Sequence, residues 1–165
     1  MEKSVKFEQY KTLKQQLLTT MDLPQVAAEQ QIATMHPLVL AYIGDAVFAL
    51  YVRLRLLERE KNKVRVLHDV GAKMVSAVMQ SHAFDKLAET LTETEQAIAR
   101  RGRNAKSTVP KSASVREYRQ STALEALFGY LFLQAEYERL DELFAQVFSA
   151  IAEKMVADEQ EKNKK

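Results

Sequence analysis

Apolar residues recur at three- and four-residue spacing along most of the chain, which is typical of amphipathic helices. The pattern predicts helices at about 4–20, 21–35, 37–60, 64–82, 92–102, 114–137 and 139–156. Pro37 suits the first turn of the third helix, where its missing N–H costs nothing. Two capping boxes, Thr92 with Glu95 and Ser114 with Glu117, mark two later helix starts.

The composition agrees with a helical protein. Of 165 residues 47% are hydrophobic, and only four are glycine and three proline, so we expect the all-α fold class and one main domain. We divide the chain into a helical extension at 1–30, the domain at 31–157 and a charged, flexible tail at 158–165. The absence of cysteine excludes disulfides, thiolate nucleophiles and cysteine zinc sites. Because the N-terminus also lacks the apolar core of a signal peptide, we expect a cytoplasmic protein.

The most apolar segment, 38–57, is nearly long enough to span a membrane. It contains Asp45, Arg53 and Arg55, each of which would cost about 2.5–3.5 kcal/mol near the centre of a bilayer. We therefore interpret it as a buried core helix and expect no membrane contact.

Asp45 is the unusual residue of this segment. An unpaired ion buried there would cost several kcal/mol, so something must compensate its charge. Its helical neighbours Ala41, Gly44 and Ala49 are small and leave room for a metal ion and a substrate phosphate. The spacing leaves a structural ion pair with Arg or Lys equally open.

Glu125 repeats this arrangement in a second apolar helix. It lies in the run 123–133 with the small residues Ser121, Thr122 and Gly129 on the same arc. Two such acids would suit one Mg²⁺ site, since Mg²⁺ is usually held by one or two carboxylates. The three histidines form no HxxxH pair, which also favours a hard, oxygen-ligated ion such as Mg²⁺ or Mn²⁺.

Positive charge is concentrated between residues 100 and 119. This stretch holds seven basic residues and one acidic residue, although the net charge of the chain is only +2. We expect Gly102 to end a helix and 102–113 to form an exposed basic loop that binds a polyanion. The candidate RNA-binding residues are Arg100, Arg101, Arg103, Asn104, Lys106 and Lys111, with Lys73 from the helix at 64–82. The alternative is a solvated surface that only aids solubility.

Three segments resemble one known family. Tyr42-Ile-Gly-Asp-Ala-Val47 and Ser121-Thr-Ala-Leu-Glu-Ala-Leu-Phe-Gly-Tyr130 are similar to the two acidic signatures of the ribonuclease III catalytic domain. Arg101-Gly-Arg-Asn-Ala-Lys106 followed by Pro110 looks like the loop of the Mini-ribonuclease III branch, which also lacks a double-stranded-RNA-binding domain. The resemblance covers about residues 36–150.

The resemblance implies a helical endoribonuclease that cleaves double-stranded RNA with Mg²⁺, or Mn²⁺ in its place, and matures the 23S ribosomal RNA precursor. It also implies a homodimer, for which the apolar helix at 38–57 offers surface, and a large-subunit ribosomal protein as a candidate presenter of the substrate. Asp45 and Glu125 would be the catalytic, metal-binding residues. Larger members carry further acids at the positions of Leu38, Ala41 and Thr122, so this site would have fewer carboxylates to bind metal ions.

Two other functions fit the same pattern. A noncatalytic RNA-binding or ribosome-assembly module would use the basic loop and keep the two acids as ion-pair partners. It would bind duplex RNA without metal-dependent cleavage. A protein-interaction helical bundle would show no salt-sensitive RNA affinity.

Overall fold

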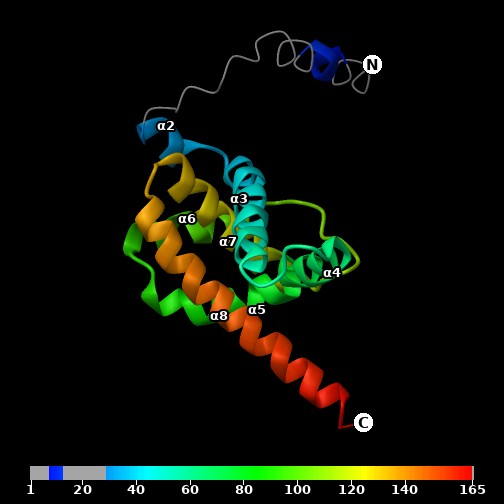
Figure 1. Ribbon diagram of the computed structural model, residues 1–165. Helices are drawn as coiled ribbons and strands as arrows, with labels where there is room; N and C mark the ends of the chain where they lie inside the picture. Colours follow the sequence, from blue (N-terminus) through cyan, green and yellow to red (C-terminus); the bar gives the residue numbers. More distant parts are fainter. Residues whose placement is uncertain (1–7, 13–28, 165) are drawn as a thin grey trace.

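The structure, a computed structural model, describes residues 8–12 and 29–164, and residues 29–164 form a helical bundle (Figure 1). Its helices are α2 (Glu29–Thr34), α3 (Pro37–Leu57), α4 (Val64–Met74), α5 (Ala77–Leu87), α6 (Glu93–Asn104), α7 (Val115–Leu133) and α8 (Tyr137–Lys162), with a 3₁₀ turn η1 (Ala88–Thr90) after α5. Residues 8–12 are also helical. The described ranges contain no strand, which confirms the all-α prediction. Most of the predicted extension at 1–30 lies outside the described residues.

Helix α7 is the centre of the bundle. It packs most extensively against α3, and also against α5 and α6. Leu124, Leu127 and Phe128 of α7 have no exposed surface. The ring of Phe128 lies edge-on to that of Phe48 from α3 at a centroid distance of 5.7 Å. The middle of α7, including Glu125, is therefore held rigidly against α3.

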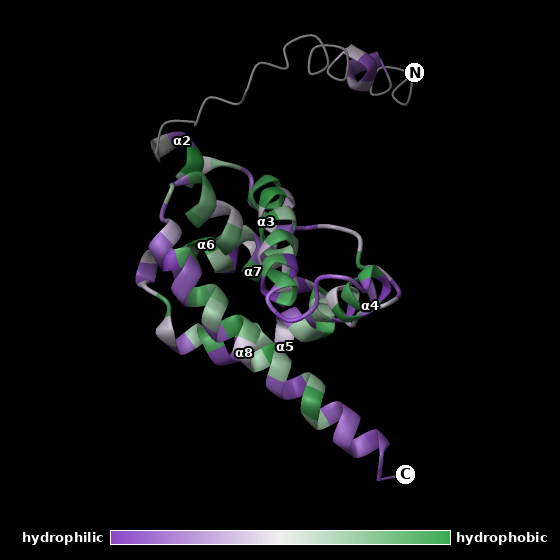
Figure 2. Cartoon of the chain, viewed as in Figure 1, coloured by the Kyte–Doolittle hydropathy of each residue, from purple (hydrophilic) through white to green (hydrophobic). Residues whose placement is uncertain are grey.

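Helix α3 is only half buried, so the prediction of a core helix is wrong for one of its faces. Leu40, Val47 and Phe48 face the core. Several large apolar residues of α3 are exposed instead: Val39, Tyr42, Leu50, Leu54 and Leu57. Figure 2 shows α3 as predominantly hydrophobic, whereas the C-terminal end of α8 is hydrophilic. A helix that is apolar on every side has no periodicity that reveals which side packs against the protein.

Among the described helices, α3 alone is long and apolar enough to cross a membrane. Length and composition are weak evidence for a span, because the core helix of a soluble protein passes the same test. The close packing of α3 along α7 places it within the bundle.

The segment predicted as one helix at 64–82 is broken in two. Ser76 caps the N-terminus of α5, where its Oγ accepts a hydrogen bond from the Met79 N–H. Both predicted capping boxes are confirmed, at Thr92 for α6 and at Ser114 for α7. The sequence does not reveal the break at Ser76, because Met79 stands where a capping box has Glu or Gln.

The prediction that Gly102 ends a helix is wrong. Gly102 lies inside α6, and a Cβ there would come within 2.8 Å of Ala126 Cβ and 3.0 Å of the Thr122 carbonyl oxygen in α7. This glycine permits close packing of two helices and caps neither. The basic residues up to Asn104 consequently lie on α6, and the loop between α6 and α7 is limited to residues 105–114.

Helix α7 ends at Leu133, four residues before the predicted end. Ala135 adopts a left-handed conformation with φ of 57°. The N–H groups of Ala135 and Glu136 donate to the carbonyl oxygens of Phe132 and Leu131, which is the Schellman pattern that usually uses glycine. Helix α8 continues to Lys162, so its predicted end at 156 is too early.

Candidate functional site

The candidate site lies where α3 crosses α7. A Cβ at Gly44 of α3 would lie 1.7 Å from the carbonyl oxygen of Glu125 in α7, and a Cβ at Gly129 would lie 1.9 Å from that of Leu40. No side chain fits at either position, so the two backbones are in direct contact. Asp45 follows Gly44 directly, and its carboxylate lies close enough to that of Glu125 for its negative charge to raise the pKa of Glu125.

The two carboxylates differ in environment. Asp45 is exposed, whereas Glu125 is only partly accessible. The pKa of Glu125 is raised from 4.5 to about 7, mainly by burial and also by the negative charge of Asp45, against the lowering effect of a hydrogen bond from Gln80. Because Asp45 is exposed, the expected cost of burying its charge does not arise.

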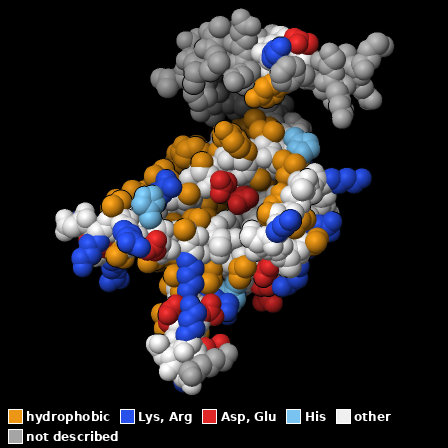
Figure 3. All heavy atoms as spheres, turned by 90° about the vertical axis from the view of Figure 1, so that its right-hand side faces the viewer, with side chains coloured by type: hydrophobic (Ala, Val, Ile, Leu, Met, Phe, Trp, Pro, Cys, Tyr) orange, Lys and Arg blue, Asp and Glu red, His pale blue; other side chains and the backbone are white. Residues whose placement is uncertain are grey.

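No cationic side chain among the described residues forms an ion pair with either carboxylate. The structural ion pair that the sequence left open is therefore absent from the part of the chain that the structure describes. Figure 3 shows an acidic group in the middle of one face of the molecule, bordered by apolar and uncharged atoms, with basic side chains toward the margins of the face. Two adjacent carboxylates without a counter-charge are the arrangement expected of a cation site.

Gln80 of α5 is the third residue of the site. Its Nε2 donates to Glu125 Oε1 at 3.2 Å and to the Val75 carbonyl oxygen at 2.9 Å. Its side chain is 1% exposed, and its Oε1 has no hydrogen-bond partner. The sequence does not point to Gln80, because no motif in it links a glutamine on α5 to a glutamate on α7.

The residues present fit a magnesium-type ion. Asp45 and Glu125 supply two carboxylates, and no group of three or more His, Cys, Asp or Glu residues occurs among the described residues. Mg²⁺ commonly takes one or two protein carboxylates and keeps water on its other positions, so this small donor set is sufficient. A bound cation would also offset the burial of Glu125 and the negative charge of Asp45, which together raise the pKa of Glu125.

Arg101, predicted to bind RNA, is half-buried and donates hydrogen bonds to two backbone carbonyl groups. Its Nη1 donates to the Ala33 carbonyl oxygen and its Nη2 to the Met35 carbonyl oxygen, both at 2.6 Å. These bonds fasten α2 and the start of α3 to α6. These two hydrogen bonds orient the guanidinium toward α2 and leave fewer of its N–H groups for a phosphate, so we expect Arg101 to contribute less to RNA binding than the other predicted residues.

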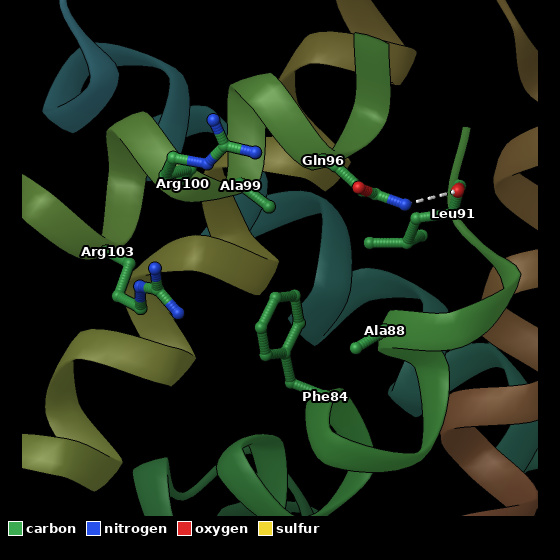
Figure 4. A pocket seen from close by; sticks show the side chains of 7 residues that line it. All are labelled: Phe84, Ala88, Leu91, Gln96, Ala99, Arg100 and Arg103. Carbon is green, nitrogen blue, oxygen red and sulfur yellow. Dashed lines mark hydrogen bonds between the residues drawn. The ribbon is translucent and has the colours of Figure 1, made fainter. Parts of the chain in front are cut away.

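Arg100 and Arg103 line a pocket of about 220 Å³ between α6 and the C-terminal end of α5 (Figure 4). Phe84, Ala88, Leu91, Ala99 and Gln96 complete its wall, with the Phe84 ring between Arg103 and Ala88. Neither arginine forms an ion pair with a described acid. Both guanidinium groups are therefore free to bind an anion.

The other predicted RNA-binding residues lie at the surface. Asn104, Lys106 and Lys111 are exposed at the end of α6 and in the loop after it. Lys73 of α4 donates to Glu159 of α8 at 3.3 Å. Such a surface ion pair contributes little free energy, so Lys73 could exchange this partner for a phosphate.

Comparison with known proteins identifies the family. The family model of the ribonuclease III domain matches residues 38–136, which include Asp45, Gln80 and Glu125. The chain belongs to the ribonuclease III family. It is therefore an endoribonuclease, and the resemblance noted in the sequence is confirmed.

The curated relatives are Mini-ribonucleases. The chain is 39% identical over 130 residues to Mini-ribonuclease 3 of Thermoanaerobacter sp. (strain X514), covering 78% of this chain and 92% of that protein. It is 49% identical over 111 residues to Mini-ribonuclease 3 of Symbiobacterium thermophilum, covering 67% and 85%. The fold is similar to the crystal structure of a Fusobacterium nucleatum protein, with a TM-score of 0.64 and 30% identity over 70% of this chain and 93% of that one. These matches place the chain in the Mini-ribonuclease III branch.

Proposed function

We propose that this protein hydrolyses phosphodiester bonds of double-stranded RNA with Mg²⁺ held by Asp45 and Glu125. The observation that carries the proposal is the meeting of these two carboxylates at the α3–α7 crossing without a cationic partner among the described residues. Members of the family act on double-stranded RNA and generally depend on a divalent metal ion. Mn²⁺, which accepts the same oxygen ligands, is expected to substitute.

The chain's own residues then have separate roles. Asp45, on the exposed side, is accessible to the ion and to a substrate phosphate, while Glu125 is fixed by burial and by Gln80. The ion, when bound, would supply Lewis acidity toward the phosphoryl oxygen and make a bound water more acidic. No protein nucleophile is needed, which fits a chain without cysteine.

The RNA path that we propose uses the predicted RNA-binding residues other than Arg101. Arg100 and Arg103 of α6 are available for phosphates, and they are followed by the exposed residues Asn104 at the end of α6 and Lys106 and Lys111 in the loop after it. A-form RNA is read mainly through its phosphates and 2′-hydroxyls, which suits flexible cations and an amide. Lys73 would contribute from α4 by exchanging its surface ion pair.

We further propose a homodimer in which the exposed face of α3 is buried against a second copy. Tyr42 is 78% exposed, and Leu50 and Leu54 are about half exposed on the same helix. A contiguous apolar surface of this kind usually marks an interface. A two-fold dimer would present one site to each strand of a duplex.

The biological substrate that we propose is the 23S ribosomal RNA precursor in the cytoplasm, with a large-subunit ribosomal protein as a candidate presenter. This part rests on the resemblance to the Mini-ribonuclease III branch and on the relatives named Mini-ribonuclease 3. Mapping the cut sites on precursor ribosomal RNA tests it. Cuts at the ends of the mature large-subunit RNA are expected.

The test of the activity compares Asp45→Asn and Glu125→Gln with the wild type on a duplex RNA, with and without Mg²⁺. Both variants should bind the duplex and fail to cleave it, because each lacks one of two carboxylates. Glu153→Gln, which changes an exposed acid on α8, is the control and should cleave normally. Binding by the wild type without metal-dependent cleavage would instead favour the noncatalytic RNA-binding module.

A further inference from the structure

Gln80 joins three elements at the site. It is in the first turn of α5, and its amide donates to Glu125 on α7 and to the carbonyl oxygen of Val75, which follows α4. Both N–H groups of the amide are used. The orientation of the amide follows from these partners, since a reversed amide would set its oxygen against two acceptors.

The amide oxygen of Gln80 is unusual in having no hydrogen-bond partner. It is the one described side-chain atom that is buried without a hydrogen-bond partner. An unpaired buried acceptor destabilises the folded protein, and leucine or methionine at this position would avoid the cost with a similar volume. The unpaired oxygen indicates that the glutamine is required for its N–H groups, which serve Glu125 and the Val75 carbonyl oxygen.

We propose that Gln80 is a positioning residue that holds Glu125 for metal binding, an inference that rests on the proposed function. The hydrogen bond from Nε2 fixes Glu125 Oε1, and no described residue donates to Oε2, which leaves that oxygen for the ion. A hydrogen bond to a carboxylate also favours its ionised form, which a metal ligand requires. Gln80 itself touches neither the ion nor the RNA in this scheme.

A purely structural role is the competing explanation, because Gln80 also satisfies the Val75 carbonyl group. Gln120 provides a matched control for it. This glutamine of α7 also joins α5 to α7, through hydrogen bonds with Ser81 and Asp85, but it does not contact Glu125. A variant at either glutamine weakens the packing of the same two helices, and only one of them should alter metal binding.

The experiment measures Mn²⁺ binding to the full chain by the loss of the free-ion electron paramagnetic resonance signal, together with single-turnover cleavage of duplex RNA. Gln80→Leu should weaken Mn²⁺ binding by about 10- to 100-fold and slow cleavage at saturating RNA by a similar factor, while RNA affinity changes less than about twofold. Gln120→Leu should leave Mn²⁺ affinity close to that of the wild type. If Gln80→Leu does not fold, Gln80→Met takes its place.

A double variant tests whether Gln80 acts through Glu125. Once Glu125→Gln has removed the carboxylate, adding Gln80→Leu should not weaken Mn²⁺ binding further. The inference is overturned if Gln80→Leu binds Mn²⁺ like the wild type, or if Gln120→Leu weakens binding as much as Gln80→Leu does. If Asp45→Asn and Glu125→Gln bind Mn²⁺ normally, it is the proposed metal site that fails.

Discussion

Gly44 of α3 and Gly129 of α7 face each other across the helix crossing, so closely that a Cβ on Gly44 would lie 2.8 Å from the Gly129 nitrogen. Real Cβ atoms essentially never approach a neighbour below 3.0 Å, and here the neighbour is backbone that cannot rotate away. The separation of α3 and α7 is thus set by the absence of two side chains. The separation of Asp45 and Glu125 depends on the same contact.

Gly44→Ala should therefore reduce both stability and activity. We expect the free energy of unfolding to fall by about 3 kcal/mol, at the upper end of the usual cost of overpacking, because the added methyl group has to push the two helices apart. Cleavage should fall more than about tenfold even where the variant is folded, since misplacement of reacting groups by about 1 Å can cost about 100-fold. Urea unfolding and single-turnover cleavage at low temperature measure the two effects.

Gly71 of α4 is the control for this substitution. A Cβ there would meet only Leu56 Cδ1, at an ordinary contact distance of 3.6 Å. Gly71→Ala should stabilise the protein by about 0.5–1 kcal/mol, since alanine is the better helix former. A Gly44→Ala variant as stable as the wild type would show that the crossing is wider than the structure has it.

The second prediction concerns pH in the absence of divalent ions. Burial and the charge of Asp45 raise the pKa of Glu125 from 4.5 to about 7. Well below pH 4.5 the carboxyl group is protonated in both the folded and the unfolded chain and contributes nothing unfavourable. Between pH 4.5 and 7 the unfolded chain loses the proton first, so the free energy of unfolding should fall as pH rises, by on the order of 3 kcal/mol.

Urea unfolding of wild type and Glu125→Gln at several pH values isolates this contribution, because histidines and other groups titrate in both proteins. The wild type should lose stability relative to Glu125→Gln from pH 4.5 to 7, and the difference should stay constant above that range. Mg²⁺ at neutral pH should restore part of the loss in the wild type, since ligand binding stabilises the folded state. Parallel pH profiles for the two proteins would exclude a raised pKa at Glu125.

The parts of the site that could be predicted are those with a local sequence pattern. A charge inside an apolar helix is conspicuous, so Asp45 and Glu125 stand out in the sequence, and capping boxes predict the starts of α6 and α7. The family resemblance also implies that the two acids share one site, but the helix crossing at Gly44 that brings them together could not be predicted, since glycine in a sequence does not reveal what packs against it.

The parts that could not be predicted depend on contacts between distant segments. Arg101 is indistinguishable in sequence from Arg103, and only the position of α2 turns its guanidinium toward backbone carbonyl oxygens. Gly102 has the same sequence signal as a helix cap, but it serves the packing of α6 on α7. The sequence likewise does not show which side of α3 is buried, because apolar residues occur on both its buried and its exposed sides.

The third prediction tests the dimer. Leu54→Glu should convert the protein to a monomer, because it places a charge on the exposed apolar face of α3 that we expect a second copy to cover. Sedimentation equilibrium at micromolar concentration measures the mass. Val156→Glu, at an exposed apolar residue of α8, should leave the mass unchanged. A wild-type mass equal to one chain, with cleavage intact, would contradict the proposed interface.

The last prediction distinguishes the exposed basic residues, which we expect to bind RNA, from Arg101, which donates to backbone carbonyl oxygens. Replacing Arg103, Lys106 and Lys111 by alanine should weaken duplex RNA binding without lowering the melting temperature, because all three side chains are exposed. The slope of log affinity against log salt should flatten by about 0.7–0.9 for each phosphate that the variant no longer neutralises. Binding is measured without divalent ions, so that cleavage does not interfere.

Arg101→Ala should behave in the opposite way. It removes two hydrogen bonds to the Ala33 and Met35 carbonyl oxygens, so the free energy of unfolding should fall by about 2 kcal/mol. Its salt slope for RNA binding should stay close to that of the wild type, because we expect the guanidinium to contribute little to phosphate binding. If Arg101→Ala flattens the slope while the triple variant does not, the RNA path passes over α2 rather than along the end of α6 and the loop that follows.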